Sequence, residues 1–217
     1  MLINLSESNS ILNRFVSELR NVKIQNDRMR FRRNMERIGE IIAYEISRTL
    51  NYVPSDIETP LGVSRTNLLS EVPLLGTILR AGLPLHQGLL NYFDHADNAF
   101  VSAYRHPIAG GSFEIKLEYC AAPSLEGRVL IVSDPMLATG ASMVLTLKEL
   151  LKLGKPKEIH VASAIACRVG IDHLLENLPQ VKIWAASIDQ ELNDKAFIVP
   201  GLGDAGDLAF GTKGEPE

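Results

Sequence analysis

Residues 130–146 read LIVSDPMLATGASMVLT. An aliphatic run ends at Asp134, a Thr-Gly-Ala-Ser turn occupies residues 139–142, and a second aliphatic run follows. A strand that only had to reverse direction would need fewer special residues here. We read the stretch as a buried strand, a polar turn and a helix, which is the repeating unit of open parallel sheets.

The polar turn offers groups that suit a phosphate. Thr139, Gly140, Ala141 and Ser142 would begin the helix and present two hydroxyls, unpaired backbone N–H groups and the positive end of the helix dipole. Asp134, at the strand end, would accept hydrogen bonds from sugar hydroxyls. The lysine of a nucleotide P-loop and the GxGxxG pattern are absent, so a phosphorylated sugar is the preferred ligand. The alternative is that Asp134 and Ser142 only cap the helix and Pro135 fixes the turn.

The flanking sequence alternates between aliphatic runs and helical patterns. Strands are predicted at residues 71–79, 98–104, 128–134, 159–166 and 181–187, and helices at 83–93, 142–154 and 169–178. This alternation predicts an α/β fold: a mainly parallel twisted sheet with helices on both faces. Residues 1–217 form one expected domain, and the Gly-rich residues 186–217 form a C-terminal lobe, which we call the hood.

The N-terminal third has a different pattern. Apolar residues recur at helical spacing over residues 6–20 and 27–50, and the second stripe comprises Met29, Phe31, Met35, Ile38, Ile41, Ile42 and Ile46. Residues 55–67 alternate around Pro60-Leu61-Gly62 and predict a protruding β-hairpin. Long amphipathic helices and such a hairpin favour a homodimer or homotetramer.

Composition narrows the class of protein. The 217 residues are 46% hydrophobic and 22% charged with a net charge of −4, so nucleic acid is not the expected partner. Cys120 and Cys167 lack metal or disulfide spacing, and both are predicted to be buried. The five histidines show no metal spacing. With no signal sequence or run of roughly 20 apolar residues, we expect a cytoplasmic location and no membrane partner.

Taken together, these motifs resemble those of the type I phosphoribosyltransferases. The segment DPMLATG at residues 134–140 is similar to the phosphoribosyl-pyrophosphate loop of the uracil enzymes, in which Pro135 replaces a second acid. Three more segments are similar: PLLGTILRAGLPLHQGLL at 73–90, AYRHP at 103–107 and IVPGLGDAGDLAFGT at 198–212. The resemblance covers residues 20–212 and implies transfer of a phosphoribosyl group to uracil N1, with UMP and pyrophosphate as products.

The resemblance also assigns the site residues. Arg80, Arg105 and Asp134 would be catalytic. Phosphoribosyl pyrophosphate would contact Arg80, Arg105, Asp134, Pro135, Met136, Leu137, Ala138, Thr139, Gly140, Ala141, Ser142 and Asp204. Uracil would be read by the backbone of Ile198, Gly203 and Ala205, with Asp204 beside the ribose. Mg²⁺ would bind mainly through the pyrophosphate, with Asp204 as the one candidate protein ligand. The alternative for Arg80, taken alone, is a surface arginine in a salt bridge.

Several positions depart from the usual motifs. Ala141 replaces a glycine, Phe197 a tyrosine and Leu208 an arginine, which leaves base selectivity open. Two further functions stay open: a pyrimidine-sensing RNA-binding regulator and a nucleotide-binding protein without turnover. The arginines at 28, 30, 32, 33 and 37 indicate a solvated, ion-paired helix face, because Glu36, Glu40 and Glu45 are interspersed with them. Some uracil enzymes respond to GTP, so GTP remains a candidate effector.

Overall fold

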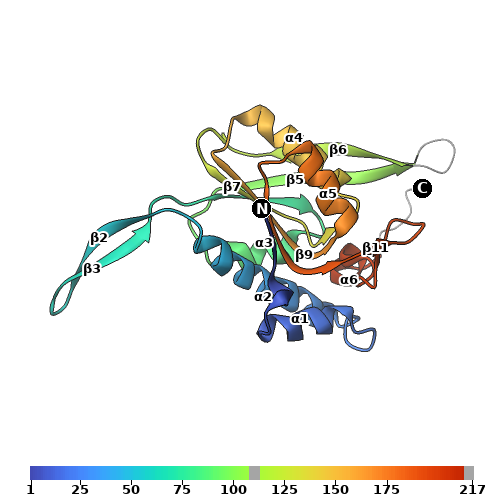
Figure 1. Ribbon diagram of the computed structural model, residues 1–217, viewed down its shortest axis with the longest axis horizontal. Helices are drawn as coiled ribbons and strands as arrows, with labels where there is room; N and C mark the ends of the chain where they lie inside the picture. Colours follow the sequence, from blue (N-terminus) through green and yellow to red (C-terminus); the bar gives the residue numbers. More distant parts are fainter. Residues whose placement is uncertain (108–112, 213–217) are drawn as a thin grey trace.

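A twisted, mainly parallel sheet is the centre of the molecule (Figure 1). The computed structural model describes residues 1–107 and 113–212, and only the backbone of 103–107 and 113–117. The strand order is β1 (Leu2–Asn4), β10 (Lys182–Asp189), β9 (Glu158–Cys167), β7 (Val129–Ser133), β4 (Leu74–Leu79), β5 (Asn98–Pro107) and β6 (Phe113–Ala121), with β8 (Met136–Leu137) also paired to β9. Only the β5–β6 pair of this sheet is antiparallel. The predicted fold class is therefore confirmed.

Helices cover both faces of the sheet (Figure 1). One face carries α1 (Ile11–Arg20), α2 (Arg28–Ser47) and α3 (Leu83–Leu90), and the other carries α4 (Ala141–Leu150) and α5 (Arg168–Asn177). Consecutive strand residues point to opposite faces, so Leu75 and Ile131 pack with the first group of helices, and Leu74 and Leu130 with the second. Such two-sided burial explains why the central strands are mostly apolar on both faces.

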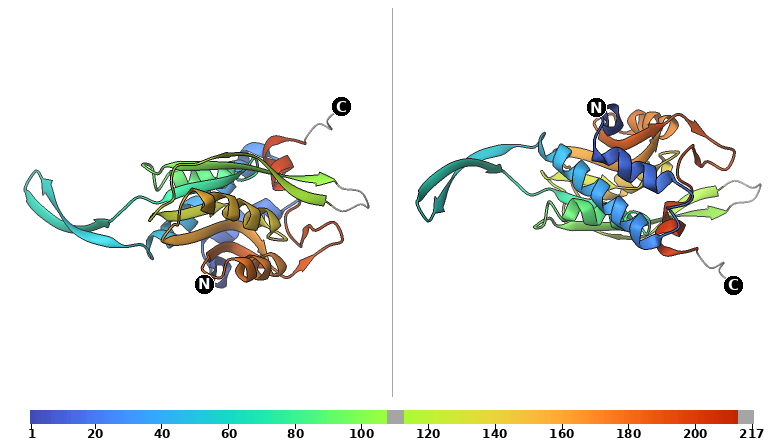
Figure 2. Two further views of the ribbon diagram at one scale, coloured as in Figure 1. Left: turned by 90° about the horizontal axis from the view of Figure 1, so that it is seen from above. Right: turned by 90° about the horizontal axis from the view of Figure 1, so that it is seen from below.

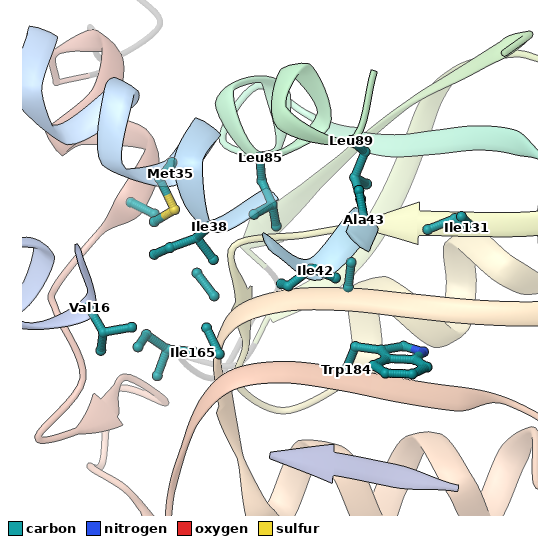
Figure 3. Close-up of a cluster of buried hydrophobic side chains, with 14 of the residues drawn as sticks. Val16, Met35, Ile38, Ile42, Ala43, Leu85, Leu89, Ile131, Ile165 and Trp184 are labelled. Atoms are coloured by element: carbon teal, nitrogen blue, oxygen red, sulfur yellow. The ribbon is translucent and has the colours of Figure 1, made fainter. Parts of the chain in front are cut away.

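The first of these cores is built around α2 (Figure 3). Met35, Ile38 and Ile42 on α2 lie between Leu85 and Leu89 of α3 and the sheet residues Ile131, Ile165 and Trp184. These side chains are almost completely buried. The predicted apolar stripe is correct for five of its seven residues, whereas Ile41 is only partly buried and Met29, in the first turn of α2, is 66% exposed.

The N-terminal helix begins later than predicted. Residues Leu5–Glu7 form a single 3-10 turn (η1), and α1 starts at Ile11. The hydroxyl of Ser10 accepts a hydrogen bond from the Leu12 N–H, which caps the helix at that point. The short strand β1 before it was not predicted, because three residues carry too little periodicity.

The predicted hairpin is present and long. Strands β2 (Tyr52–Thr59) and β3 (Gly62–Leu69) pair antiparallel, with the turn at Pro60-Leu61. Both views of Figure 2 show the hairpin extending away from the body, at the opposite end from the hood. Most of its side chains are exposed, and the contacts to the body lie at its base, where Leu69 packs against the core and the Tyr52 hydroxyl donates to the Ser47 carbonyl oxygen.

The hood starts later than the sequence indicated. Strand β10 continues to Asp189, and the hood that follows contains β11 (Glu191–Leu192), β12 (Ile198–Val199) and the short helix α6 (Ala205–Phe210).

Helix α4 ends in a 3-10 turn, η2 (Leu151–Leu153), before Gly154. No described helix has the length and apolarity needed to cross a membrane.

Two side-chain predictions have different outcomes. Cys167 is buried, but Cys120 is exposed on β6, because an edge strand has one face open to solvent; its burial was predicted wrongly. Within the described chain, two of the five α2 arginines form ion pairs: Arg33 with Glu36 and Glu40 of the same helix, as expected, and Arg30 with Glu18 of α1. Arg32 donates to the Ala209 carbonyl oxygen and so ties α2 to the hood.

Candidate active site

Two loops meet at the carboxyl ends of neighbouring strands β7 and β4. The Thr77 hydroxyl donates to the Ser133 carbonyl oxygen at 3.3 Å, and the Ser133 hydroxyl donates to the Gly76 carbonyl oxygen at 3.2 Å. A Cβ atom added to Gly82 would collide with Thr77 Oγ1 and lie 3.2 Å from the Ser133 carbonyl oxygen. The loop that carries Arg80 therefore packs directly on the loop that starts with Asp134.

The Asp134 loop curls around a small hollow of about 50 Å³. The lining residues are Asp134, Met136, Leu137, Ala138, Thr139, Gly140, Ser142 and Met143. Met136 and Leu137 form β8, whose pairing with β9 anchors the outer wall of the loop. Pro135 and Ala141, both predicted contacts, do not line the hollow, whereas Met143, a buried residue of α4, does.

Backbone donors of this loop have no protein partner. Within residues 1–107 and 113–212, no hydrogen bond uses the N–H of Thr139, Gly140 or Ser142. Gly140 is the N-cap of α4 with φ of 77°, and the Thr139 hydroxyl accepts a hydrogen bond from the Ala141 N–H at 3.4 Å, whereas neither Asp134 nor Ser142 accepts from the first turn of α4 in the described chain. The alternative in which Asp134 and Ser142 serve only as caps is therefore wrong. Free N–H groups at a helix start are an anion site.

A second glycine, which sequence reasoning missed, supports this loop. A Cβ on Gly140 would lie 2.6 Å from the Gly170 carbonyl oxygen, and a Cβ on Gly170 would lie 2.9 Å from the carbonyl carbon of Ala138. The first turn of α5 thus touches the backbone of the loop from behind. Gly170 in the segment RVGID gave no signal, because a helical glycine has no distinctive sequence context.

We expect Gly170→Ala to weaken binding of an anionic ligand at the loop by roughly tenfold or more, because the new methyl group must push residues 138–140 outward. The measurement is the ligand KM or Kd, with circular dichroism to confirm folding. Val169→Ala, at the exposed neighbouring position, is the control. Unchanged affinity in Gly170→Ala would show that the loop tolerates displacement.

Asp134 occupies an apolar position at the strand end. Burial raises the pKa of its carboxyl group from the ordinary value of 3.8 to about 7, while the Met136 backbone N–H opposes this change. A carboxylate with a pKa this high is typical of a functional site in a cleft. The predicted position of Asp134 at the edge of the hollow agrees with the structure.

Arg80 connects its loop to the hood. Its Nη2 group donates to the Asp207 carboxylate at 3.0 Å and to the Gly211 carbonyl oxygen at 2.6 Å. Its Nε atom is buried and has no hydrogen-bond partner in the described chain. Arg80 thus forms the partly exposed ion pair of the alternative reading, with Asp207, and in addition has one N–H, at Nε, without a partner in the described chain. Arg105 lies in β5, paired with Ile115 beyond the end of β4, but its side chain falls outside the described residues.

The predicted base-reading residues lie on the hood, next to Arg80. Ile198 is buried in β12, and the N–H groups of Gly203 and Ala205 have no partner within the described chain. Asp204 caps α6 through a hydrogen bond from the Asp207 N–H at 3.0 Å. A Cβ on Gly206 would lie 3.7 Å from Ala81 and 3.9 Å from Arg80 Nε, so α6 abuts the Arg80 loop.

A larger cleft of about 510 Å³ lies beside these residues. It is lined by Gln25, Asn26, Arg28, Leu202, Gly203, Asp204, Asp207, Leu208 and Thr212. The α1–α2 connection and the hood therefore face each other across open space. Leu208, one of the positions that depart from the usual motif, is among the lining residues.

A mainly parallel sheet with a loop of free N–H groups after one strand, an arginine loop after the neighbouring strand and a hood joined to that arginine is the arrangement of a type I phosphoribosyltransferase. A family model described as uracil phosphoribosyltransferase matches residues 6–212. The chain belongs to the uracil phosphoribosyltransferase family.

Named relatives agree with this assignment. A uracil phosphoribosyltransferase from Porphyromonas gingivalis is 52% identical over 213 residues, which cover 98% of this chain and 99% of that protein. One from Thermococcus gammatolerans is 36% identical over 208 residues, 94% and 91% of the two chains. Among solved structures, the AQ2163 protein from Aquifex aeolicus superimposes with a TM-score of 0.87 at 30% identity, covering 97% and 98% of the two chains.

Proposed function

We propose that this protein is a uracil phosphoribosyltransferase, which transfers the 5-phosphoribosyl group of 5-phospho-α-D-ribose 1-diphosphate to N1 of uracil. The observation that carries the proposal is the contact between the free-amide loop at Asp134 and the Arg80 loop, with the base-reading hood joined to Arg80. The substrates follow from the family to which the chain belongs. The site offers polar groups that suit the phosphate, the base and the pyrophosphate of these substrates.

The loop of residues 138–142 suits the 5-phosphate. It offers free N–H groups of Thr139, Gly140 and Ser142 and two hydroxyls at the start of α4. Ala141 is the first residue of that helix, so its methyl group is compatible with the backbone where relatives carry glycine. We assign the phosphate to this cradle.

The hood suits a flat base with alternating donors and acceptors. The free N–H groups of Gly203 and Ala205 would donate to uracil carbonyl oxygens, and the backbone of Ile198 would complete the recognition. Cytosine carries an amine where uracil carries a carbonyl, so a donor would face a donor and the site would reject it. Base choice therefore depends on the backbone and needs no charged side chain.

The reaction forms the bond from N1 to the anomeric carbon and breaks the bond from that carbon to the pyrophosphate oxygen. Positive charge develops on the sugar ring, and ionised Asp134 would stabilise it. Negative charge develops on the departing pyrophosphate, towards which the unpartnered Nε of Arg80 would donate, together with Arg105. The proton of N1 leaves with formation of the new bond, and the electron pair of the broken bond goes to pyrophosphate.

We propose Mg²⁺ as the cofactor, bound mainly by pyrophosphate oxygens. Within residues 1–107 and 113–212, no three His, Cys, Asp or Glu side chains converge as a metal site. This fits a metal held chiefly by substrate, because Mg²⁺ often keeps several waters and uses one or two carboxylates. Asp204 is the candidate protein ligand, since one oxygen caps α6 and the other has no hydrogen bond in the described chain. The ion would neutralise charge on the leaving group.

The deciding experiment incubates the purified protein with 5-phosphoribosyl diphosphate, Mg²⁺ and each nucleobase separately, and follows nucleotide formation by chromatography. We expect UMP from uracil, at least about 100-fold less product from cytosine, and none when Mg²⁺ is removed with EDTA. A parallel series with GTP tests the candidate effector. Salt-dependent RNA binding without turnover would favour the regulator, and nucleotide binding without turnover the inactive binding protein.

We propose in addition that two copies associate through the β2–β3 hairpin, in a cytoplasmic homodimer that can pair further into a tetramer. The hairpin exposes Leu61 completely, Val63 at 71% and Val53 at 47%, which is unfavourable for a lone protein arm in water. A symmetric partner would bury these residues at a self-complementary contact.

Val63→Asp is expected to convert the dimer to monomers, because a buried charge in the interface lacks a counter-ion. Light scattering coupled to size-exclusion chromatography would show the mass fall by about half. Val22→Asp is the matched control, since Val22 has the same exposure on the α1–α2 connection. If both variants keep the wild-type mass, the hairpin is not the interface.

A further inference from the structure

Arg20, the last residue of α1, reaches the carboxyl end of β10. Its Nη1 and Nη2 groups lie 2.7 and 2.8 Å from the two carboxylate oxygens of Asp189, and Nη2 also donates to the Ser187 hydroxyl at 3.0 Å. A two-pronged arginine–carboxylate pair fixes orientation as well as distance. Only 20% and 8% of the two side chains are exposed, unlike a loose surface ion pair.

The Arg20–Asp189 pair forms hydrogen bonds with both the carbonyl group and the N–H group of Gly201, a residue of the hood. Arg20 Nη1 donates to the Gly201 carbonyl oxygen at 3.0 Å, and the Gly201 N–H donates to Asp189 Oδ2 at 3.0 Å. The next residue is held by a separate side chain: Gln25 Nε2 donates to the Leu202 carbonyl oxygen at 2.8 Å. The end of α1 and the connection after it therefore anchor the hood backbone at two consecutive residues.

Gly201 in turn fixes the carbonyl group of Ile198. Gly201 has φ of 53°, and a Cβ there would lie 2.9 Å from the Ile198 carbonyl carbon. The turn is thus folded directly onto that carbonyl. The proposed base-reading residues are Ile198, Gly203 and Ala205. Along the chain, the anchored residues 201 and 202 lie between Ile198 and the other two.

We infer that Arg20 is a positioning residue for base recognition: through Asp189 and Gly201 it holds the hood backbone in the conformation that reads uracil. The inference rests on the proposed function. In the described chain Arg20 makes no hydrogen bond to residues 134–142 or to Arg80. Its loss should therefore affect the base and leave the phosphoribosyl substrate largely untouched.

The test compares Arg20→Met with Arg14→Met by steady-state kinetics with both substrates varied. Arg14 is the matched control, since it lies on the same helix and is 68% exposed. For Arg20→Met we expect KM for uracil to rise roughly tenfold or more, as for lost hydrogen bonds to a charged group. KM for 5-phosphoribosyl diphosphate and kcat should stay within about threefold of wild type, and Arg14→Met should match wild type throughout.

If Arg20 only stabilised the fold, the changes in KM and kcat would follow a different pattern. Equal increases in both KM values, or a fall in kcat with KM for uracil unchanged, would overturn the inference. Asp189→Asn should reproduce the selective increase, and the double variant Arg20→Met/Asp189→Asn should be no worse than the more affected single variant, because both act through Gly201. Independent, additive effects would also overturn it. Arg20→Lys keeps the charge but loses the two-pronged contact, so its KM for uracil should lie between those of wild type and Arg20→Met.

Hydrogen–deuterium exchange separates failure of this inference from failure of the proposed function. Arg20→Met should speed exchange of the Gly201 amide, which donates to Asp189, and leave the amides of α4 unchanged. If the wild type does not turn over uracil, the proposed function fails, and the base-reading role fails with it. Unaltered exchange at the Gly201 amide would overturn the anchoring itself. If Arg20→Met does not fold, Gln25→Leu must raise KM for uracil selectively, and an unchanged value would count against the inference.

Discussion

Arg80→Ala is expected to lower kcat by about 100- to 1000-fold, the usual effect of removing one donor that stabilises developing negative charge. On the proposed mechanism Arg80 donates to the leaving pyrophosphate, and its Nε, which is buried, has no partner in the described chain. Steady-state assays with saturating uracil and 5-phosphoribosyl diphosphate would measure the change. A kcat near that of wild type would remove Arg80 from the mechanism.

The fold should survive this substitution. Asp207, the residue that loses its partner, is 38% exposed and can be hydrated, so its isolation costs little. Thermal melting followed by circular dichroism should shift by only a few degrees. Arg80→Lys is the informative companion, because it keeps the charge but cannot contact Asp207, Gly211 and pyrophosphate together. We expect it to recover a minor part of the activity.

Asp134→Asn is expected to lower kcat/KM by about 100-fold at pH 8 and to abolish its pH dependence. In the wild type only the ionised carboxylate can stabilise positive charge on the sugar. Because burial places the pKa of Asp134 at about 7, kcat/KM of the wild type should fall about tenfold per pH unit below that value. A wild-type profile that stays level from pH 8 to pH 5 would contradict the assignment.

The same variant should be more stable than wild type at alkaline pH. A carboxyl group with a raised pKa in the folded state favours folding when protonated, so stability is full below pH 3.8 and declines as pH rises towards 7. At about 1.4 kcal/mol per pH unit, discounted for partial exposure, Asp134→Asn should gain roughly 1–3 kcal/mol at pH 8. Urea titrations at pH 5 and pH 8 would measure it, with Asp172→Asn on α5 as an exposed control.

Most of the long strands of the sheet could be predicted from the local sequence pattern. The central strands β4, β7, β9 and β10 are buried on both faces, so their aliphatic runs were unmistakable. Strand β6, at the sheet edge, and the short strands β1, β8, β11 and β12 were missed. A strand at an edge depends on the register of its neighbour more than on its own composition. Cys120 on β6 was misplaced for the same reason.

Some residues of the candidate site could likewise be predicted from the sequence, and others could not. The loop at Asp134 could be read directly, because phosphate binding needs hydroxyls, a glycine and a helix start close together in sequence. Gly170 and Arg20 could not be read, since each acts on a segment roughly 30 to 180 residues distant, through contacts that local sequence does not encode.

The sequence alone determined the α/β class, the polar turn before α4 and the family resemblance, because these depend on neighbouring residues and on periodic burial. Only the tertiary structure decided that Arg80 joins the hood, that Gly170 supports the loop and that Arg20 anchors Gly201. The physical reason is that these are contacts between separate elements, whose distances are set by the packing of two cores on opposite faces of one sheet.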